Sequence, residues 1–210
     1  MALPAIAPYG LPGPGDLPAR KVPWHVDPAR AAVLVHDLQN YFLGAFPAEG
    51  PPLAPALANT ARILTHARGL GMPVIYSHQR GGQSAAERGL QLDFWGPGLP
   101  DDPAAQGVPE VVAPAGSDTM LLKWKYSAFA RTELAAILEA AGRDQLVIVG
   151  VYAHIGVLMT AADAWSRDIQ AFVVGDAVAD FSAEKHREAL RWAAEKCAVV
   201  LSTDELLETA

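Results

Sequence analysis

The sequence predicts a three-layer α/β/α domain built on a six-stranded, mainly parallel sheet. Short apolar runs, typical of parallel strands buried on both faces, recur along the chain. Segments with apolar residues at helical spacing separate these runs, and this alternation favours parallel strand connections. A length of 210 residues, of which 51% are hydrophobic, suits one packed domain. We therefore expect a single domain over residues 31–210, preceded by an extended Pro- and Gly-rich arm at residues 1–30.

The first half of the chain supplies two expected strands and one long connection. Ala31–Val35 is the first strand, and a helix with apolar residues from Leu57 to Ala67 follows and ends at nearby glycines. Pro73–Ser77 is the second strand. The stretch from His78 to Pro100 is long for a connection in a compact domain, and such loops are usually functional or disordered.

The second half alternates more regularly between the two kinds of element. The expected strands are Thr119–Leu122, Leu146–Gly150, Ala171–Val174 and Cys197–Leu201. The expected helices run from Thr132 to about Ala141 and from Ile155 to Ser166, with a third opened by Ser182 and Glu184. Ser202 and Glu205 have the spacing of a capping box, which predicts a short last helix.

Polar side chains gather where the expected strands end. In doubly wound parallel sheets, ligands bind beyond the carboxyl ends of the strands. The sequence therefore predicts a binding crevice at that edge of the sheet. The residues that follow strand ends are Asp37, Gln79, Arg88, Lys123, Tyr152, His154 and Asp176.

Asp37 directly follows a strand that reads as buried, and it has two interpretations. It is a general acid if burial raises its pKa, or it is a structural carboxylate that caps a helix or forms a salt bridge. Lys123 binds a carboxylate or orients Asp37, or it is a solvated lysine at a strand end.

The long connection carries three further candidates. Arg88 has the planar fork that clamps a carboxylate, but it also has Glu87 and Asp93 as potential partners nearby. Trp95 and Phe94 either wall an apolar pocket or cover the core.

Two histidines, His36 and His154, lie next to strand ends. Both are interpreted as hydrogen-bonded structural histidines.

Several classes of protein are disfavoured by composition. A net charge of −7 without any run of Lys or Arg argues against nucleic-acid binding and against an anionic membrane surface. No apolar stretch approaches the roughly 20 residues of a membrane span, and the N-terminus does not read as a signal peptide. The single Cys197 and the histidine spacing argue against a metal site, and the lack of glycine after the first strand argues against a nucleotide-binding site. We expect a cytoplasmic protein with a small-molecule substrate.

Four segments resemble the isochorismatase family: "VLVHDLQNYF", "RGLQLDFWGPG", "KWKYSAF" and "GVYAHIGVLMTAADAWSRDIQAFVVGDAVADFS". The resemblance runs from about Ala31 to Leu207. The related cysteine amidohydrolases carry a nucleophilic Cys at the start of the helix after the fourth strand, where this sequence has Gly156. The resemblance thus implies that amidohydrolase chemistry is absent. The sequence is most similar to the standalone phenazine-pathway branch of the family, and this similarity implies that no carrier module follows the hydrolase domain.

The resemblance implies hydrolysis of a vinyl ether. Pyruvate would leave 2-amino-2-deoxyisochorismate or isochorismate, giving a trans-dihydro-hydroxyanthranilate or a dihydroxy-dihydrobenzoate. Asp37 would protonate the terminal CH2, and its apolar surroundings would keep it protonated unless the Lys123 charge opposed this. No metal or cofactor takes part, and a homodimer is implied. The implied substrate-binding groups are Gln79, Arg88, Lys123, Tyr152 and the backbone N–H of Gly156, with Trp95 and Phe42 as apolar walls.

Two alternatives stay open at this point. One is an amidohydrolase-superfamily member that lacks the cysteine and acts on another substrate. The other is a non-catalytic module that binds a carrier protein, although the presence of Asp37 and Lys123 favours an enzyme. The choice between an amino and a hydroxyl group on the ring also stays open, because a pocket that merely tolerates this group accepts both.

Overall fold

The computed structural model describes residues 3–208 and contains one sheet of six parallel strands. Their order is β3-β2-β1-β4-β5-β6, so the chain starts in the middle of the sheet and fills first one side and then the other. This confirms the predicted fold class. The strands are β1 (Ala31–His36), β2 (Val74–His78), β3 (Thr119–Leu122), β4 (Gln145–Val151), β5 (Gln170–Ala179) and β6 (Ala198–Leu201).

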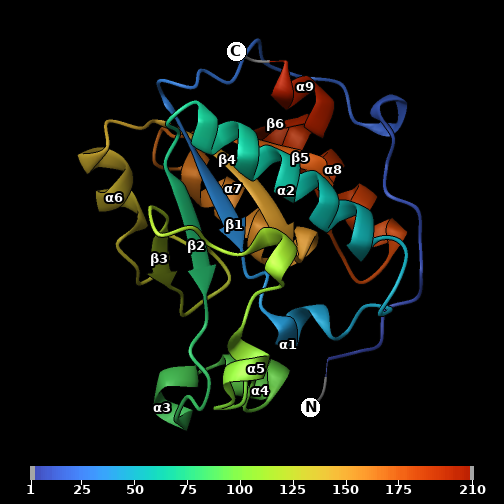
Figure 1. Cartoon of the computed structure of the whole chain (residues 1–210), viewed down its shortest axis with the longest axis vertical. Coiled ribbons are helices and arrows are strands. Elements are labelled where there is room, and N and C mark those ends of the chain that lie inside the picture. The colour runs from blue at the N-terminus through green and yellow to red at the C-terminus, as the bar shows by residue number, and fades with distance from the viewer. Residues whose placement is uncertain (1–2, 209–210) are drawn as a thin grey trace.

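Helices cover both faces of the sheet and make it the middle of three layers (Figure 1). On the face toward the viewer lie α2 (Leu53–Gly69) and α9 (Thr203–Leu207). The other face carries α6 (Leu134–Ala140), α7 (Leu158–Trp165) and α8 (Ala183–Lys196). Successive side chains of a strand point to opposite faces, so a strand that is covered on both faces is mainly apolar. In β1, Val33 and Val35 join the core beneath α2, whereas Ala32 and Leu34 join the core beneath α6 and α7.

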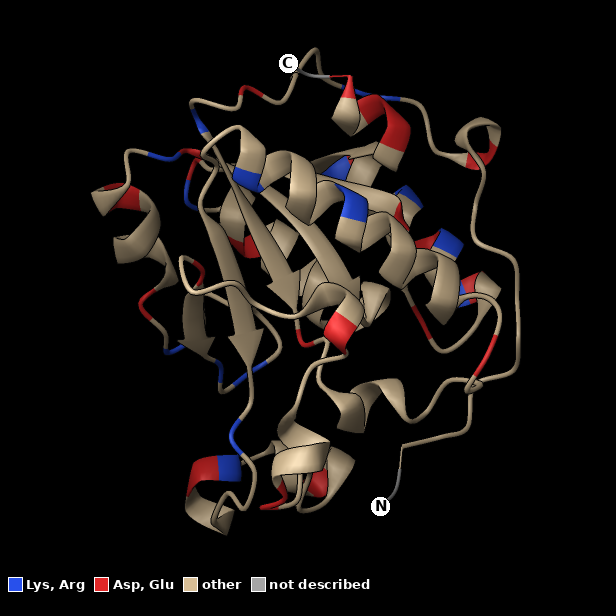
Figure 2. Cartoon of the chain, in the orientation of Figure 1, with Lys and Arg blue, Asp and Glu red and all other residues tan. Residues whose placement is uncertain are grey.

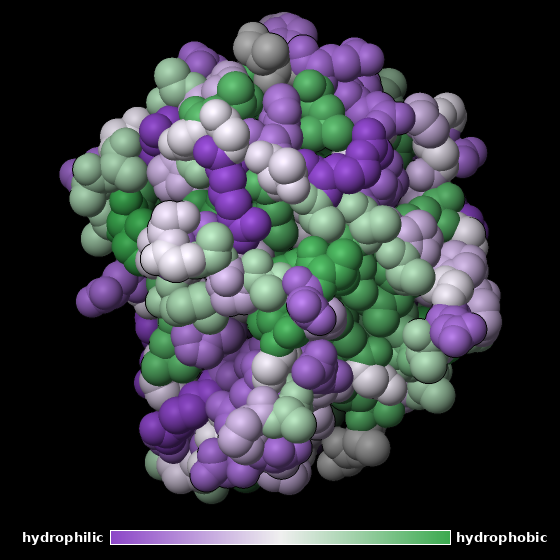
Figure 3. All heavy atoms as spheres, viewed as in Figure 1, coloured by the Kyte–Doolittle hydropathy of each residue, from purple (hydrophilic) through white to green (hydrophobic). Residues whose placement is uncertain are grey.

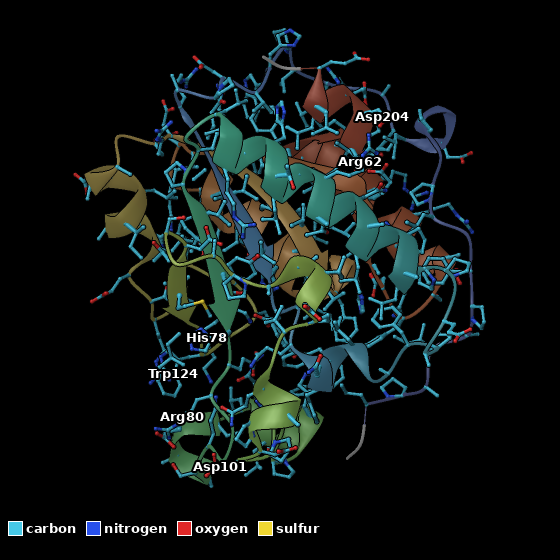
Figure 4. The ribbon with its side chains drawn as sticks, viewed as in Figure 1. Arg62, His78, Arg80, Asp101, Trp124 and Asp204 are labelled. Atoms are coloured by element: carbon cyan, nitrogen blue, oxygen red, sulfur yellow. The ribbon has the colours of Figure 1, made fainter. Side chains whose placement is uncertain are left out.

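Several helix ends match their expected chemistry. The Ser202 hydroxyl accepts a hydrogen bond from the Glu205 N–H, and the Glu205 carboxylate accepts one from the Ser202 N–H, which confirms the capping box of α9. Ser182 caps α8 by accepting from the N–H of Lys185 at 3.2 Å. Arg62 of α2 pairs with Asp204 of α9 at 2.7 Å and ties the two helices of one layer together (Figure 4).

Some boundaries differ from expectation. The expected helix from Thr132 begins at Leu134, and the expected helix from Ile155 opens instead with a π-helical turn, η3 (Ala153–Val157), before α7. Cys197 is not inside a strand: it ends α8 one residue before β6. It is nonetheless buried, and burial raises the pKa of its thiol to about 11.

The fifth strand is longer than predicted, and this changes the place of Asp176. The pairing of β4 with β5 shifts register after Ile148 and resumes at Gly150 with Val178, so β5 continues to Ala179. Asp176 therefore lies within the strand. Its carboxylate accepts hydrogen bonds from the N–H and hydroxyl of Thr203 at the start of α9, at 2.8 and 2.7 Å. The expectation that Asp176 faces the crevice is wrong.

Short elements extend beyond the carboxyl ends of the strands (Figure 1). They are α1 (Asn40–Leu43), α3 (Ala85–Arg88), α4 (Gln91–Trp95) and α5 (Pro103–Gln106), while η2 (Glu110–Val112) leads the chain back to β3. The long connection from His78 to Pro100 is thus a folded segment that contains α3 and α4, and we call it the excursion. Figure 2 shows Lys and Arg on the loops that leave β2 and β3 toward it, and Figure 3 shows predominantly hydrophilic residues over α3 to α5.

Residues 3–30 contain one short element, η1 (Pro14–Asp16), and otherwise run along the outside of the domain (Figure 1). Ile6 and Val26 of this arm are buried in the core beneath α2. Arg20 pairs with Glu205 of α9 at 2.8 Å. The arm is therefore part of the packed structure on its described length.

Candidate active site

A pocket opens at the carboxyl ends of the central strands, where the topology predicts a ligand site. Its lining comes from β1, β2, β3 and β4 and from the folded excursion. It includes the eight residues that the family resemblance implies as catalytic or substrate-binding. These are Asp37, Phe42, Gln79, Arg88, Trp95, Lys123, Tyr152 and Gly156.

Asp37 forms the polar floor of this pocket. It is 5% exposed, and Oδ2 lies 2.9 Å from Nζ of Lys123. The Ser77 hydroxyl donates to Oδ1 at 2.6 Å, and Nε2 of Gln79 donates to Oδ2 at 3.2 Å. The backbone of Asp37 has a φ of 50°, in the left-handed region that aspartate tolerates better than most residues. The turn at the end of β1 therefore aims this carboxyl back toward β2 and β3.

The charge state of Asp37 differs from the expectation. Burial opposes ionisation, but the Lys123 ammonium and the Ser77 hydrogen bond outweigh it and hold the pKa of Asp37 below its usual range. The carboxyl is therefore ionised at neutral pH when the pocket holds no ligand. The apolar strand before Asp37 suggested a protonated acid, and what it could not reveal is a lysine that is itself buried beside it.

Two of the alternative interpretations are wrong. Lys123 is 2% exposed, so it is not a solvated lysine, and its ammonium also donates to the Lys125 carbonyl at 2.6 Å. Asp37 is not a helix cap, because α1 begins at Asn40 without a side-chain cap. Of the two structural roles considered for Asp37, the salt bridge is the one that the carboxylate makes, with Lys123.

Arg88 is a buried cation without an acidic partner among residues 3–208. It is 5% exposed; Nε donates to the Gly96 carbonyl at 3.0 Å and Nη1 to Oε1 of Gln79 at 3.5 Å. Glu87 pairs with Arg80 at 2.6 Å instead, so the proposed bridge from Arg88 to Glu87 is not made. A Cβ at Gly98, which has a φ of +75°, would lie 2.4 Å from Cζ of Arg88. The excursion thus folds closely over the guanidinium and leaves its charge for a ligand.

Aromatic rings form the apolar side of the pocket. The rings of Tyr152 and Phe181 lie 4.4 Å apart, and those of Trp95 and Phe181 lie 6.1 Å apart. The Tyr152 hydroxyl donates to the Phe42 carbonyl at 2.6 Å, so Tyr152 presents its ring to the pocket. Phe94 is 70% exposed and does not line the pocket, which corrects its expected role as a wall.

Three aromatic residues of this wall were missed by sequence reasoning. They are Tyr41, Tyr126 and Phe181. Tyr126 accepts a hydrogen bond from the Trp95 indole at 2.7 Å and so links the excursion to the loop after β3. Phe181 lies two residues beyond the end of β5 at Ala179, so a correct strand boundary would have found it.

His36 and His154 are both hydrogen-bonded histidines, as expected. Nδ1 of His36 donates to the Val151 carbonyl at 2.9 Å, and burial lowers the pKa of His36 to about 4. Nδ1 of His154 lies 2.5 Å from Oδ1 of Asp180, and Oδ2 of the same carboxylate accepts from the His154 backbone N–H at 2.6 Å. Neither belongs to a group of metal-ligating side chains: residues 3–208 contain no cluster of three His, Cys, Asp or Glu suited to an ion. Over the same residues, every helix is too short or too polar to cross a bilayer.

Comparison with solved structures first defines the class. An isochorismatase family protein from Burkholderia thailandensis superposes with a TM-score of 0.77 and 25% identity, covering 88% of this chain and 96% of that one. A cysteine hydrolase from Pseudomonas syringae pv. phaseolicola gives a TM-score of 0.80 at 24% identity, over 90% and 95% of the two chains, and shows the shared fold. The chain thus has the fold of isochorismatase-like hydrolases.

Sequence comparison then gives the family. The isochorismatase domain model matches residues 31–205, and the chain belongs to the isochorismatase family. It is 50% identical over 208 residues to "Isochorismatase" of Bacillus subtilis, covering 99% of this chain and 67% of that protein. It is 48% identical over 210 residues to "Phenazine biosynthesis protein PhzD" of Pseudomonas fluorescens, covering 98% of each. The resemblance drawn from the sequence motifs is confirmed.

Proposed function

We propose that this enzyme hydrolyses the vinyl ether of 2-amino-2-deoxyisochorismate or isochorismate and releases pyruvate. The ring product is a trans-dihydro-hydroxyanthranilate or a dihydroxy-dihydrobenzoate. The observation that carries the proposal is the buried pair of Asp37 and Lys123 at the floor of a pocket that also holds the unpaired cation of Arg88. Relatives at 50% and 48% identity are named for isochorismatase activity and phenazine biosynthesis, which supports this substrate class.

Asp37 has the position of the general acid in this reaction. Its proton adds to the terminal CH2 of the enolpyruvyl group, and the electrons of the C=C bond form the new C–H bond. The resulting oxocarbenium ion is trapped by water, which returns one proton to the carboxylate. The hemiketal then collapses with cleavage of the bond to the ring oxygen, and its hydroxyl proton ends on the ring alcohol. One water molecule is consumed, and no cofactor or covalent nucleophile takes part.

Substrate binding promotes the protonation of Asp37. The substrate brings two carboxylates, which Arg88 and Lys123 are placed to receive. Their negative charge beside Asp37, together with a weakened contact to Lys123, raises the pKa of Asp37 and favours protonation from solvent. Asp37 thereby takes up its proton only when a ligand with two carboxylates is in the pocket.

The remaining pocket residues orient the substrate and restrict water. Gln79 contacts both the Asp37 carboxylate and Arg88, so it couples the acid to the carboxylate-binding cation. Trp95, Tyr152 and Phe42 surround the reacting bond with apolar surface, and the backbone of Gly156 closes the side nearest His36. A drier site strengthens the electrostatic contacts on which the protonation depends.

Two further parts of the proposal are the ring substituent of the preferred substrate and the oligomeric state of the enzyme. The resemblance of the motifs to the phenazine-pathway branch, together with a match to a phenazine biosynthesis protein over 98% of both chains, favours 2-amino-2-deoxyisochorismate as the better substrate, with isochorismate accepted. We also propose a cytoplasmic homodimer. Exposed apolar side chains support an interface between copies: Met120 on the edge strand β3 and Met159 and Trp165 on α7 are 48%, 38% and 54% exposed. Light scattering that shows only a monomer at all concentrations would contradict the dimer.

The function is tested by offering both substrates to the purified enzyme. Pyruvate is followed continuously, and the ring products are separated and identified. We expect pyruvate and a non-aromatic ring product from both, with the larger kcat/KM for the amino compound. No pyruvate from either would refute the proposal and would favour a non-catalytic module, while pyruvate with an aromatic product would indicate a lyase.

A further inference from the structure

His36 lies between two glycines that approach it within contact distance. It ends β1 and is 1% exposed. A Cβ built on Gly150 would lie 2.2 Å from the carbonyl oxygen of His36, and a Cβ built on Gly156 would lie 2.1 Å from Cε1 of its ring. Real Cβ atoms never approach other atoms so closely. Both the backbone and the imidazole of His36 therefore depend on neighbours that have no side chain.

The imidazole is held in place by a hydrogen bond and by burial. Nδ1 donates to the Val151 carbonyl at 2.9 Å, which fixes the ring plane and the tautomer. With a pKa lowered by burial to about 4, the ring is neutral at pH 7. The residue is 1% exposed and lines the pocket beside Asp37, and buried, closely packed side chains transmit a displacement to their neighbours.

The neighbour that would receive such a displacement is Asp37. It follows His36 directly and turns the chain with a φ of 50°. Its Oδ2 lies 3.9 Å from Nδ1 of His36 and 2.9 Å from Nζ of Lys123. A shift of His36 would therefore move the carboxyl relative to its ammonium partner, and misplacements of about 1 Å at a reacting group can cost about 100-fold in rate.

We infer that His36 and Gly156 form one steric unit that holds the Asp37 carboxyl at the floor of the pocket. The imidazole fills the space that a side chain at position 156 would need, so a side chain at 156 and an imidazole at 36 exclude each other. His36 is a positioning residue and transfers no proton. The kinetic consequence rests on the proposed function, since Asp37 matters for rate only as the proton donor; the steric pairing itself does not.

The experiment is a double-substitution cycle with G156A, H36A and H36A/G156A. The matched control is G69A in α2, where an added Cβ meets no atom within 4 Å. Thermal unfolding is measured without substrate, and kcat and KM are measured by pyruvate release. We expect G156A to lower both Tm and kcat, with a loss of kcat of about tenfold or more. We expect G69A to resemble the parent enzyme and KM to change less than kcat in G156A.

Removal of the imidazole should relieve the clash. In the H36A background, the added methyl at 156 fills part of the space that the ring vacates, so H36A/G156A should unfold no lower than H36A. Its loss of kcat relative to H36A should be at least about tenfold smaller than the loss that G156A causes alone. His36→Asn adds a second readout: the amide can still donate to the Val151 carbonyl, so we expect more kcat than in H36A at similar KM.

The outcomes separate cleanly. G156A tolerated in the parent enzyme, or equally harmful with and without His36, would overturn the inference. If G156A does not fold, a folded H36A/G156A supports the steric unit, whereas failure of the double variant alongside a folded H36A overturns it. A parent enzyme that releases no pyruvate would refute the proposed function, and the unfolding measurements would still decide the steric pairing.

Discussion

The ammonium of Lys123 lies 2.9 Å from Oδ2 of Asp37, and the two side chains are 2% and 7% exposed. A buried ion pair of this kind contributes little net stability, because desolvation offsets most of the attraction. Its position on the pocket floor gives it another consequence. The pair holds a carboxylate ready to accept a proton when a ligand brings further negative charge, and the predictions below follow from that arrangement.

Asp37→Asn should abolish most turnover and leave ligand affinity close to that of the parent. The amide keeps the size of the side chain and accepts from Ser77, but it has no proton of suitable acidity to give. We expect kcat to fall well beyond tenfold, which corresponds to a rise of more than about 1.4 kcal/mol in the activation barrier. Stopped-time pyruvate assays give kcat, and calorimetry with the ring product gives affinity. More than a tenth of the parent kcat would remove Asp37 from the role of acid.

The pH dependence should distinguish kcat/KM from kcat. Asp37 is ionised in the free enzyme because its pKa lies below its usual range, and substrate carboxylates with pKa values of about 4 are ionised too. The reacting complex holds one proton more than its free partners. Each rise of one pH unit above the pKa of Asp37 should therefore lower kcat/KM about tenfold, while kcat stays level until the higher pKa of the complex is passed.

Initial rates from about pH 5 to pH 8 at low and saturating substrate test this difference. A kcat/KM that stays level across the range would mean that Asp37 is already protonated in the free enzyme. That result would contradict the charge state argued from the Lys123 contact.

Arg88→Lys should weaken substrate binding more than turnover. Lysine keeps the charge but loses the planar fork that matches a carboxylate, so we expect KM to rise about tenfold, equivalent to about 1.4 kcal/mol. Arg80→Ala is the matched control in the same excursion, because Arg80 has a side chain that is 49% exposed and pairs with Glu87 outside the pocket. Figure 4 shows Arg80 in this excursion and Asp101 just beyond its end. Equal KM values for the two variants would argue against Arg88 as the carboxylate-binding cation.

The N-terminal arm should contribute to the pocket through Tyr9. Its hydroxyl accepts from the backbone N–H of Asp180 at 2.7 Å and lies 3.2 Å from Nδ1 of His186. Tyr9→Phe leaves the Asp180 N–H without this partner and should lower the free energy of unfolding by about 1–3 kcal/mol. Because Phe181 of the pocket wall follows Asp180, KM should rise as well. Urea unfolding and kinetics measure both effects.

Lys21→Ala is the control on the same arm, since Lys21 is exposed and its ammonium donates to the Glu195 carbonyl at 3.0 Å, away from the pocket. We expect its stability to change by no more than about 0.5 kcal/mol. If Tyr9→Phe were as mild as Lys21→Ala, the arm would not position the pocket wall.

Local chemistry predicted the sheet and much of the site. The apolar runs of the sequence identify six strands. The rule that ligands bind at the carboxyl ends of parallel strands predicts that Asp37, Lys123 and Arg88 share one pocket. What the sequence could not supply were distances. The lowered pKa of Asp37 depends on a lysine 86 positions away along the chain that packs beside it, and single-residue patterns carry no such information.

The remaining errors share a physical origin in irregular pairing. Asp176 was placed at a strand end because Gly175 and Asp176 interrupt the apolar run, yet a register shift lets β5 continue to Ala179. The same shift hid Phe181. The contact between Gly156 and the ring of His36 was equally invisible, since it joins two elements only after the sheet forms.

Isotope incorporation into pyruvate tests the central claim most directly. If Asp37 protonates the vinyl CH2, the proton comes from solvent, because a carboxyl in an open pocket re-equilibrates between turnovers. In D2O, pyruvate analysed at early times, before its methyl hydrogens exchange spontaneously, should carry one deuterium in its methyl group, and the ring product should retain its hydrogens. A pericyclic lyase would instead transfer a ring hydrogen directly. Pyruvate with an undeuterated methyl at early times, together with an aromatic product, would contradict the role assigned to Asp37.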